Sequence, residues 1–379
     1  MTKTKLILFS LLFIYANINA QVIEKTYYFD NYKITKTADH ETINFDNTML
    51  TGKIGEPVLP YQSVSLLLPP GEVAESIEVI GEDEVNISGT FSLYPQQYVR
   101  PMSEESSGEF VKNELTYSMT TAYPSSQTGE LITQYMNGYS IALSSFTPLK
   151  YLPASGKVSY FKKITIKIQT RKDTKANNAL TKLTSNFEVL KRVKKFVQNP
   201  DLINLYPKRV LNNNGYQLLI ISPFQFVDDF SDLVFLYRVR GIKTKVVSTD
   251  SIYASSTGQD SPEKIRNFIL QEYQNNNIEY VLLAGDVEHI PYRGFYCHVQ
   301  SSSVYEDYNI PSDLYYSALD GNWNNNSNNK WGEIGEDDLL PEISVARIPG
   351  SNLSELNNMI NKIKSYQDTP VLNEFDKPL

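Results

Sequence analysis

The chain has 379 residues, of which 41% are hydrophobic and 21% charged, and its formal net charge at pH 7 is −8. That length suits two or three domains with separate cores, and the composition excludes a wholly disordered protein. No basic face dominates, so we expect no nucleic-acid partner, whereas the acidic balance is compatible with binding of cations.

The first 20 residues have the layout of a secretory signal peptide. Lys3 and Lys5 precede an apolar stretch over residues 6–15, and Ala20 ends a cleavage site with small residues. A membrane anchor is the weaker reading, because the apolar stretch is too short to span a bilayer. No later segment is long and apolar enough, so we expect a protein without a membrane span that is secreted or held at the cell surface.

Residues 21–170 are expected to form an all-β domain. Short runs of β-branched or alternating apolar residues recur between Pro, Gly and Ser, and helical periodicity is nearly absent. The predicted strands cover residues 26–29, 64–68, 76–80, 97–99, 139–143 and 164–169. This pattern indicates an antiparallel sandwich or barrel.

Residues 171–215 are basic and polar, a composition typical of a linker. One amphipathic helix is predicted within this segment, over residues 185–198. Lys208 and Arg209 form a dibasic pair shortly before three asparagines and a glycine. An exposed dibasic pair in a linker is a candidate site of proteolytic processing, and the alternative is an ordinary solvated surface.

Strands and helices alternate from residue 216 to residue 379. Strands are predicted over residues 217–221, 242–247, 280–284 and 342–348, and helices over residues 226–240, 262–274 and 353–366. Ser261 is the expected N-cap of the second helix, and Ser351 or Asn352 that of the third. This alternation predicts an α/β fold, a three-layer parallel sheet with right-handed crossovers.

The predicted strand over residues 280–284 is an uninterrupted apolar run, which is typical of a central parallel strand covered on both faces. It runs directly into Gly285 and Asp286. A carboxylate therefore lies at the edge where open α/β sheets keep their ligand crevice.

Three motifs of this region are similar to those of one family: YVLLAGDVEHIP (280–291), SDLYYSALDG (312–321) and PEISVARIP (341–349). Together with the helix over 261–273, they resemble the gingipain-type cysteine peptidases, secreted enzymes with a caspase-like α/β catalytic domain. Upstream, GEPVLPYQSVSLLLPPG (55–71) resembles the β-rich propeptide of these enzymes. The resemblance implies a zymogen that hydrolyses protein or peptide substrates and whose propeptide packs on its own catalytic domain.

The family's catalytic residues are not expected within these 379 residues. In the family the catalytic His, in a Gly-His-Gly context, and the nucleophilic Cys follow the PEISVARIP-like strand, and no Gly-His-Gly occurs here. We therefore expect the dyad downstream of Leu379 and this chain to be an inactive amino-terminal part. Two alternatives remain: a sortase-type member that processes exported proteins, and a non-catalytic calcium-stabilised surface module.

Cys297, the single cysteine, is followed by His298, which invites a Cys–His dyad. Adjacent side chains on a strand point to opposite faces, however, and FYCHVQ reads as a β-like apolar run in which a cysteine is a small hydrophobe. We therefore expect no dyad here and no disulfide framework. His289 is expected to be a loop residue, and His40 to titrate in water.

An acidic, Asn-rich loop over residues 320–342 concentrates oxygen donors of the kind that hard cations require. Five carboxylates gather at its end, namely Glu333, Glu336, Asp337, Asp338 and Glu342. By charge pattern alone, a solvated acidic loop without bound metal is favoured.

The family resemblance implies a structural calcium ion at this loop. Its ligands would be the side chains of Asp286, Asp338 and Glu342 and the backbone carbonyls of Asp320 and Leu340.

Three further expectations concern this loop and residues outside it. An EF-hand-like site on Asp320, Asn322 and Asn324 is disfavoured, because Trp331 stands where the bidentate Glu belongs. Arg347 is expected to pair with the acids of the loop rather than to snorkel at the sheet edge. Asp313 is expected to cap or orient its loop, or to serve a plain turn.

Overall fold

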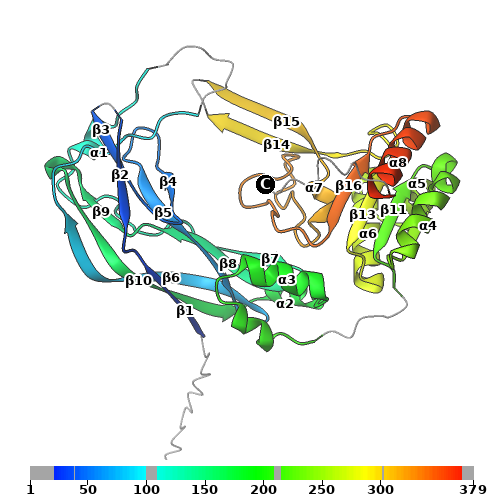
Figure 1. Ribbon diagram of the computed structural model, residues 1–379, viewed down its shortest axis with the longest axis horizontal. Coiled ribbons are helices and arrows are strands. Elements are labelled where there is room, and N and C mark those ends of the chain that lie inside the picture. The colour runs from blue at the N-terminus through cyan, green and yellow to red at the C-terminus, as the bar shows by residue number, and fades with distance from the viewer. Residues whose placement is uncertain (1–20, 38, 100–108, 209–214, 301–302, 369–379) are drawn as a thin grey trace, which may run out of the picture.

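The computed structural model describes residues 21–37, 39–99, 109–208, 215–300 and 303–368 (Figure 1). A β-rich part precedes residue 209, and an α/β part follows residue 214. The signal peptide expected over residues 1–20 and Arg209 of the dibasic pair lie outside the described residues. No helix within the described ranges is both long and apolar enough to cross a membrane.

The first sheet of the β-rich part is built on two strands of 16 residues, β6 (Glu72–Ile87) and β10 (Lys157–Lys172). β10 pairs antiparallel with β6, with β1 (Val22–Tyr28) and with β9 (Leu149–Leu152). Alternation along β10 fixes its two faces: Ile164 and Ile166 are fully buried, whereas Lys163 forms an ion pair with Glu82 on the outer face.

The second sheet is also antiparallel and packs on the first. Its strands, in spatial order, are β4 (Met49–Thr51), β5 (Leu59–Leu67), β8 (Tyr139–Phe146) and β7 (Ile132–Met136). A hairpin of β2 (Tyr32–Thr37) and β3 (His40–Phe45) lies beside it. Leu66 and Phe146 of this sheet and Ile166 of the other share one apolar core.

The prediction of a strand over residues 97–99 is wrong. This segment is irregular, and the Gln97 side chain binds the backbone of Val111, accepting from its N–H at 2.9 Å and donating to its carbonyl at 2.8 Å. A short helix, α1 (Glu114–Tyr117), follows, and a 3-10 turn, η1 (Pro153–Ser155), joins β9 to β10. Hydrogen bonds between the Gln97 side chain and the Val111 backbone take the place of sheet pairing here.

Residues 171–205 are not a linker. They form α2 (Thr174–Thr181), α3 (Phe187–Phe196) and the 3-10 segment η2 (Pro200–Leu205). Val189 and Val193 of α3 pack with Leu67 and Tyr139 of the second sheet. The helix predicted over residues 185–198 is confirmed as α3, and only α2 was not predicted. A short apolar stripe is enough to fix a helix on a sheet. Lys208, beyond these elements, is exposed.

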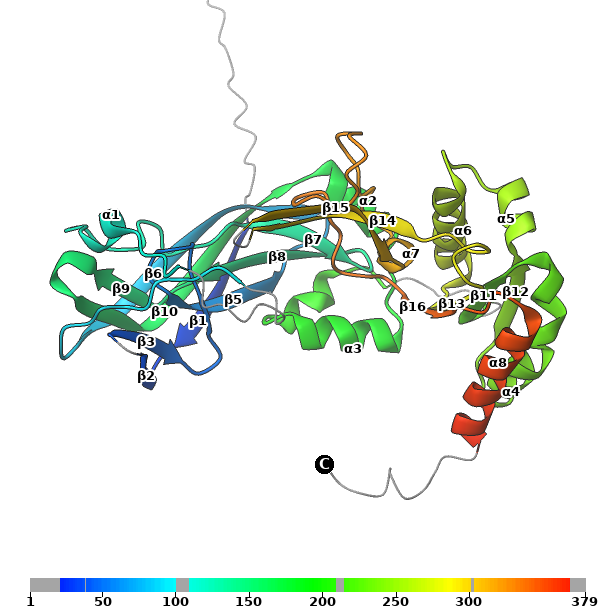
Figure 2. The same cartoon turned by 90° about the horizontal axis from the view of Figure 1, so that it is seen from above.

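The α/β part is a four-stranded parallel sheet, in the spatial order β12 (Thr244–Ser248), β11 (Leu218–Ser222), β13 (Tyr280–Ala284) and β16 (Ser344–Ile348). Helices α4 (Ser231–Val239) and α8 (Leu353–Asp368) cover one face, and α5 (Thr249–Ser255) and α6 (Ser261–Asn276) cover the other (Figure 2). A 3-10 segment, η3 (Phe224–Phe230), leads into α4. Strands and helices alternate along this part of the chain, as predicted from the sequence, and this alternation explains why the strands pair in parallel.

Alternate residues of β11 supply the two cores of this part. Leu218 and Ile220 pack with α4 and α8, whereas Leu219 and Ile221 pack with α5 and α6. All four are buried, which explains why this strand reads as a continuous apolar run.

Two helix caps refine the predicted ones. Asp260, not Ser261, is the N-cap of α6, and its Oδ1 accepts from the N–H of Glu263 at 3.0 Å. Asn352, one of the two candidates for α8, accepts from the N–H of Glu355 at 3.1 Å.

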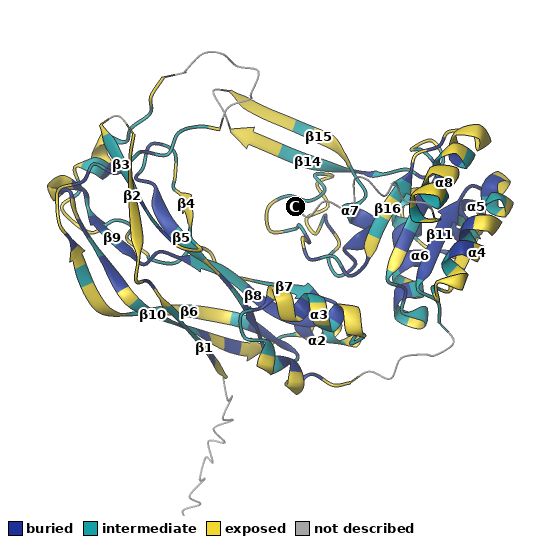
Figure 3. Ribbon diagram, in the orientation of Figure 1, coloured by how far each residue is buried: buried dark blue, intermediate teal, exposed yellow. Residues whose placement is uncertain are grey.

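A long hairpin of β14 (Arg293–Gln300) and β15 (Val304–Ser312) extends from the α/β part, and α7 (Leu314–Ser317) follows it. Most of its surface is exposed or half-buried (Figure 3). This hairpin was not predicted from the sequence, apart from the β-like character of the segment around Cys297.

Candidate functional site

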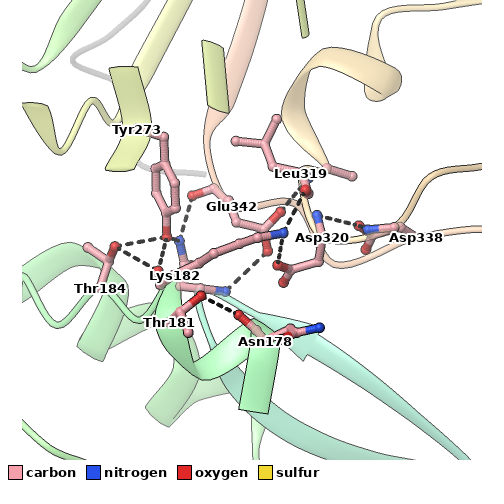
Figure 4. Close-up of polar contacts among 12 residues, drawn as sticks. Asn178, Thr181, Lys182, Thr184, Tyr273, Leu319, Asp320, Asp338 and Glu342 are labelled. Carbon is pink, nitrogen blue, oxygen red and sulfur yellow. Dashed lines mark hydrogen bonds and ion pairs between the residues drawn. The ribbon is translucent and has the colours of Figure 1, made fainter. Parts of the chain in front are cut away.

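Three carboxylates of the acidic loop come together where the two parts of the molecule meet (Figure 4). Asp320 lies just after α7, and Glu342 lies just before β16. Asp338 lies on the loop between them and binds the backbone at Asp320. Their burial is unusual for carboxylates, since Asp338 is 6% and Glu342 1% exposed.

Glu342 is held by backbone donors from both parts of the chain. Its Oε2 accepts from the N–H of Leu319 at 2.6 Å, and its Oε1 accepts from the N–H of Asn137, on the β-rich part, at 3.2 Å. Burial raises the pKa of Glu342 well above its ordinary value, and the charges of Asp320 and Asp338 raise it further.

Asp338 fixes the loop that carries Asp320. Its Oδ2 accepts from the N–H groups of Asp320 and Gly321, at 3.3 and 3.1 Å. Burial and the Asp320 charge raise the pKa of Asp338 to about 6, although the hydrogen bond from Gly321 and the Arg266 charge oppose this. Arg266 of α6 donates to the carbonyls of Tyr315 and Ala318 and so holds the same loop from the other side.

The carboxylate of Asp320 is the least satisfied of the three. Its side chain is 6% exposed, yet neither oxygen has a hydrogen-bond donor within the described residues. Its one counter-charge is Lys182, the C-cap residue of α2, whose Nζ lies 3.2 Å from Oδ1. The same Nζ also donates to the Leu319 carbonyl at 3.2 Å.

The turn between β7 and β8 inserts into this site. Asn137 and Gly138 both have positive φ, 52° and 84°, as expected for a two-residue Asn-Gly hairpin turn. A Cβ on Gly138 would lie 2.5 Å from the Leu183 Cα, so only glycine fits. The turn therefore seats tightly against the end of α2.

Every polar group of the Asn137 side chain has a partner, although the residue has no exposed surface. Its Nδ2 donates to the Tyr273 hydroxyl and to the Glu342 carbonyl, both at 2.9 Å. Its Oδ1 accepts from Arg192 at 2.7 Å, and Arg192 also donates to the Glu342 carbonyl at 2.9 Å. We call this set, Asn137, Lys182 and Arg192 against Tyr273, Asp320 and Glu342, the tip contact.

The ligand set implied for calcium is not assembled as a whole. Asp286 follows the carboxyl end of β13, whereas Glu342 precedes the amino end of the neighbouring parallel strand β16, where Ala284 pairs with Ile348. Asp286 donates its N–H to Gly350, which lies eight residues beyond Glu342. At about 3.3 Å per residue, Asp286 and Glu342 are roughly 25 Å apart.

Asp286 serves as a turn residue instead. Its Oδ1 accepts from the N–H of Val287 at 2.7 Å, and its Oδ2 accepts from the Ser351 hydroxyl at 3.2 Å. Leu340 is buried with its side chain in the core under α3. Among the described residues, no three His, Cys, Asp or Glu side chains are placed so as to hold a metal ion.

The EF-hand-like reading also lacks support in the described loop. The Asn322 side chain accepts from the N–H of Asn324 at 3.0 Å, and the Asn324 side chain accepts from the N–H of Asn328 at 3.1 Å. These side-chain oxygens stabilise turns of the loop itself.

Arg347 does not pair with the acidic loop. It forms a two-pronged ion pair with Asp313, at 2.7 and 2.8 Å, and donates to the carbonyls of Gly285 and Ile290. It thus ties β16 to the segment after β13 and to the start of α7.

The histidines and the cysteine form no catalytic pair in the described structure. Cys297 and His298 are neighbours on β14, half-buried and exposed respectively, and no hydrogen bond joins them. His289 contacts the Ser351 carbonyl at 3.0 Å. His40 is half-buried beside the rings of Tyr94 and Phe110 rather than free in water.

Two family models divide the chain at the boundary seen in the structure. The propeptide model Propeptide_C25 matches residues 19–197, and the model of Peptidase family C25 matches residues 211–376. The chain belongs to the gingipain-type cysteine peptidases and carries their propeptide. Helices α2 and α3 lie within the propeptide match, in agreement with their packing on the β-rich part.

Curated relatives support the same family. Gingipain R2 of Porphyromonas gingivalis is 26% identical over 149 residues, which are 39% of this chain and 20% of the relative. Gingipain R1 of Porphyromonas gingivalis is also 26% identical, over 39% of this chain and 14% of its own length. The match thus spans about a fifth or less of these relatives.

Among solved structures, the complex of the Porphyromonas gingivalis RgpB pro- and mature domains is 16% identical, with a TM-score of 0.37. That alignment covers 48% of this chain and 93% of the other.

The tip contact joins the propeptide to the C25 segment, and sequence reasoning missed its three propeptide residues. The Asn137-Gly138 pair between two β-like runs is a signal for a hairpin turn. Nothing in the local sequence marks Lys182 or Arg192, because their partners, the Asp320 carboxylate and the Glu342 carbonyl, lie over a hundred residues away.

Proposed function

We propose that this chain is the amino-terminal part of a secreted zymogen of a gingipain-type cysteine endopeptidase. The observation that carries the proposal is the tip contact, in which the propeptide seats a buried turn and two basic side chains on the C25 segment. The α/β part supplies the scaffold, and the nucleophilic Cys and its His base are placed downstream of Leu379.

The chemistry of such an enzyme is attack by a thiolate on a peptide carbonyl, with a His as general acid and base. The carboxyl edge of the parallel sheet is the place for that chemistry, because ligands of open α/β sheets bind there. The tip contact lies at the opposite, amino edge. The propeptide is therefore anchored away from the proposed reaction centre.

Processing of the zymogen is proposed at Lys208 and Arg209. Lys208 is exposed, and it lies between the residues matched by the two family models. A cut here would free the propeptide from its covalent tether and leave the tip contact as the attachment.

Calcium beside Asp320, Asp338 and Glu342, without Asp286, stays a proposal drawn from the resemblance, because the described side chains do not by themselves assemble three ligands around one ion. The supporting observation is the buried Asp320 carboxylate, whose two oxygens lack hydrogen-bond donors. Bound calcium would neutralise these acids and fix the loop between α7 and β16. Calorimetric titration of the intact chain with calcium chloride tests the proposal, and binding weaker than millimolar removes it.

The peptidase function is tested on the protein as its source secretes it. Antibodies raised against the C25 segment would identify the secreted species, and a fluorescent thiol-directed peptide probe would label any active-site cysteine. We expect the antibody-reactive species to take the label and to lose it after pretreatment with iodoacetamide. Antibody-reactive protein that never takes the label would favour a non-catalytic surface module.

The purified 379-residue chain provides the matched control. It is expected to cleave no peptide substrate, because Cys297 has no imidazole partner. Turnover by this chain that disappears in Cys297→Ala would overturn the placement of the nucleophile downstream.

A further inference from the structure

We propose that residues 369–379 of this chain dock in an apolar groove on the α4/α8 face of the parallel sheet, at the amino end of its strands. Val371, Leu372 and Phe375 supply the docked side chains. Such docking completes the covering of the sheet within the C25 segment, whatever chemistry the enzyme performs.

The groove has a volume of about 310 Å³ and a mainly apolar lining. Its lining includes Leu218, Tyr237, Ile242, Tyr280, Leu282 and Ala346. All of these but Tyr280 and Ala346 also belong to the core under α4 and α8, so the groove lies on that face of the sheet. Tyr280 and Ala346 are exposed.

This part of the sheet lacks the covering that its neighbouring strand has. Ile220 of β11 is fully buried, whereas Leu282 and Ala346, which lie in register with it on β13 and β16, are half-buried and exposed. Strands of a parallel sheet are normally covered on both faces. The open apolar face therefore requires one more segment.

Helix α8 leaves the groove open because its second half packs on α4. Lys364 of α8 donates to Asp232 of α4 at 2.7 Å. At the end of the helix, Gln367 donates to the Tyr237 hydroxyl at 3.3 Å, and Tyr237 lines the groove. The chain that follows Asp368 therefore starts at the rim of the groove.

The sequence of residues 369–379, TPVLNEFDKPL, suits an apolar groove. Val371, Leu372 and Phe375 are its large apolar residues before position 376, where the match to the C25 family model ends. Pro370 disfavours the α conformation at Thr369, so we expect an extended chain from this point on.

The groove lies within reach of this segment. It runs across β11, β13 and β16, which are two strand spacings of about 4.8 Å each, or roughly 10 Å in all. The chain from Asp368 to Leu372 reaches up to about 13 Å when it is extended. Leu372 can therefore contact Ala346.

Two other segments approach this end of the sheet without entering the groove. Tyr216, which precedes β11, packs in the core under α5 and α6 and donates its hydroxyl proton to Glu272, so this segment lies on the opposite face. Helix α3 of the propeptide borders a separate hollow, which includes Glu188, Arg192 and Tyr280. The segment after α8 is thus the occupant that the surroundings favour.

The first experiment traps the docked segment by a disulfide in the full chain. Cys297→Ala removes the single cysteine, and Leu372→Cys is combined with Ala346→Cys. We expect an intramolecular disulfide, seen as a faster band on a non-reducing gel, to form at least tenfold faster than in Leu372→Cys with Phe235→Cys. Phe235 is the matched control, since it is exposed on α4.

A second measurement needs no cross-link. Chymotrypsin cuts after Leu372 and Phe375, and a docked segment is cut only when it opens. Ala346→Asp places a charge in the groove, and we expect cleavage at these two residues, followed by mass spectrometry, to become at least tenfold faster. Phe235→Asp should be cut at the rate of the unaltered chain.

Three outcomes would overturn the docking. The first is equal rates of disulfide formation in the two cysteine pairs. The second is cleavage that a folded Ala346→Asp variant does not accelerate. The third is a disulfide between Leu372→Cys and Ala346→Cys of two molecules, seen as a dimer on the same gel, because it assigns the groove to a second copy of the chain.

Discussion

Asn137 shows how much a single buried polar side chain contributes to the joint between propeptide and C25 segment. Its amide and its backbone N–H contact Arg192, Tyr273 and Glu342, and Figure 4 shows the side chains of Tyr273 and Glu342 at this contact. Buried hydrogen-bonding groups are costly to leave without partners, so such a residue is difficult to replace.

We predict that Asn137→Gly destabilises the chain by about 2 kcal/mol, since glycine keeps the positive φ but removes the side-chain hydrogen bonds to Arg192, Tyr273 and Glu342. The measurement is the midpoint of urea unfolding. Asn47→Gly is the matched control, because Asn47 also has a positive φ, of 62°, but is exposed. Equal effects of the two variants would contradict the role given to Asn137.

The pKa of Glu279 yields a prediction about pH. Burial raises this pKa, the Glu188 carboxylate of α3 raises it further, and Arg192 opposes both. A carboxyl group with a raised folded-state pKa is more stable protonated, so its ionisation costs stability as pH rises above its ordinary value of 4.5. The cost is absent below that pH and complete above the raised pKa.

We therefore predict that Glu279→Gln stabilises the chain at pH 7 and has no such effect near pH 4. The glutamine retains the acceptor for Asn186, which donates to Glu279 at 2.7 Å. Because the carboxylate is only half-buried, the gain should stay below about 1 kcal/mol. Urea unfolding of both proteins across this pH range provides the measurement, and a constant difference would refute the assignment.

At the scale of elements, the sequence predicts what depends on local pattern. Strand β13 was predicted with its observed bounds, because a run of apolar residues bounded by polar ones suits a central strand. Helix α3 was predicted over residues 185–198, whereas α2 was missed in a segment judged to be a linker, because a stripe of a few apolar residues is weak beside many lysines.

The error over Asp286 has a geometric cause. Asp286 follows a strand and Glu342 precedes one, and parallel strands place these positions at opposite edges of the sheet. The sequence alone already shows that Asp286 follows its predicted strand and that Glu342 stands at the start of another. For parallel strands, this order is enough to place the two acids at opposite edges of the sheet. Lys182 had no comparable signal, because it reaches the site from the other part of the chain.

Arg347 connects secondary-structure elements, since it links β16 to two loops. We predict that Arg347→Lys destabilises the chain by about 1–3 kcal/mol, because an ammonium group cannot form the planar pair with Asp313 and both carbonyl contacts at once. Thermal unfolding measures the effect. Lys364→Met, which removes an exposed ion pair with Asp232, should change stability by less than about 1 kcal/mol.

At the scale of the whole molecule, the two edges of the parallel sheet make different contacts. The amino edge receives the propeptide through the tip contact, and the carboxyl edge ends in the turn of Asp286 and Ser351. Anchoring at one edge leaves the other free to be covered or uncovered by other segments.

This separation predicts that cleavage alone does not release the propeptide. When the chain is cut at a protease site inserted between residues 209 and 214, both pieces should elute together in size-exclusion chromatography. The packing of Leu340 in the core under α3 and the hydrogen bond from Arg192 to the Glu342 carbonyl hold them, and neither depends on the tether.

Arg192→Met should weaken that association, because it removes the donor to both Asn137 and the Glu342 carbonyl. We expect at least a tenfold rise in the dissociation constant, which corresponds to about 1.4 kcal/mol. Arg238→Met is the control, since Arg238 is exposed on α4 and stacks over the Phe235 ring, away from the tip contact. If the cut pieces of the unaltered chain separate at micromolar concentration, the tip contact is too weak to anchor the propeptide and the two-edge arrangement fails.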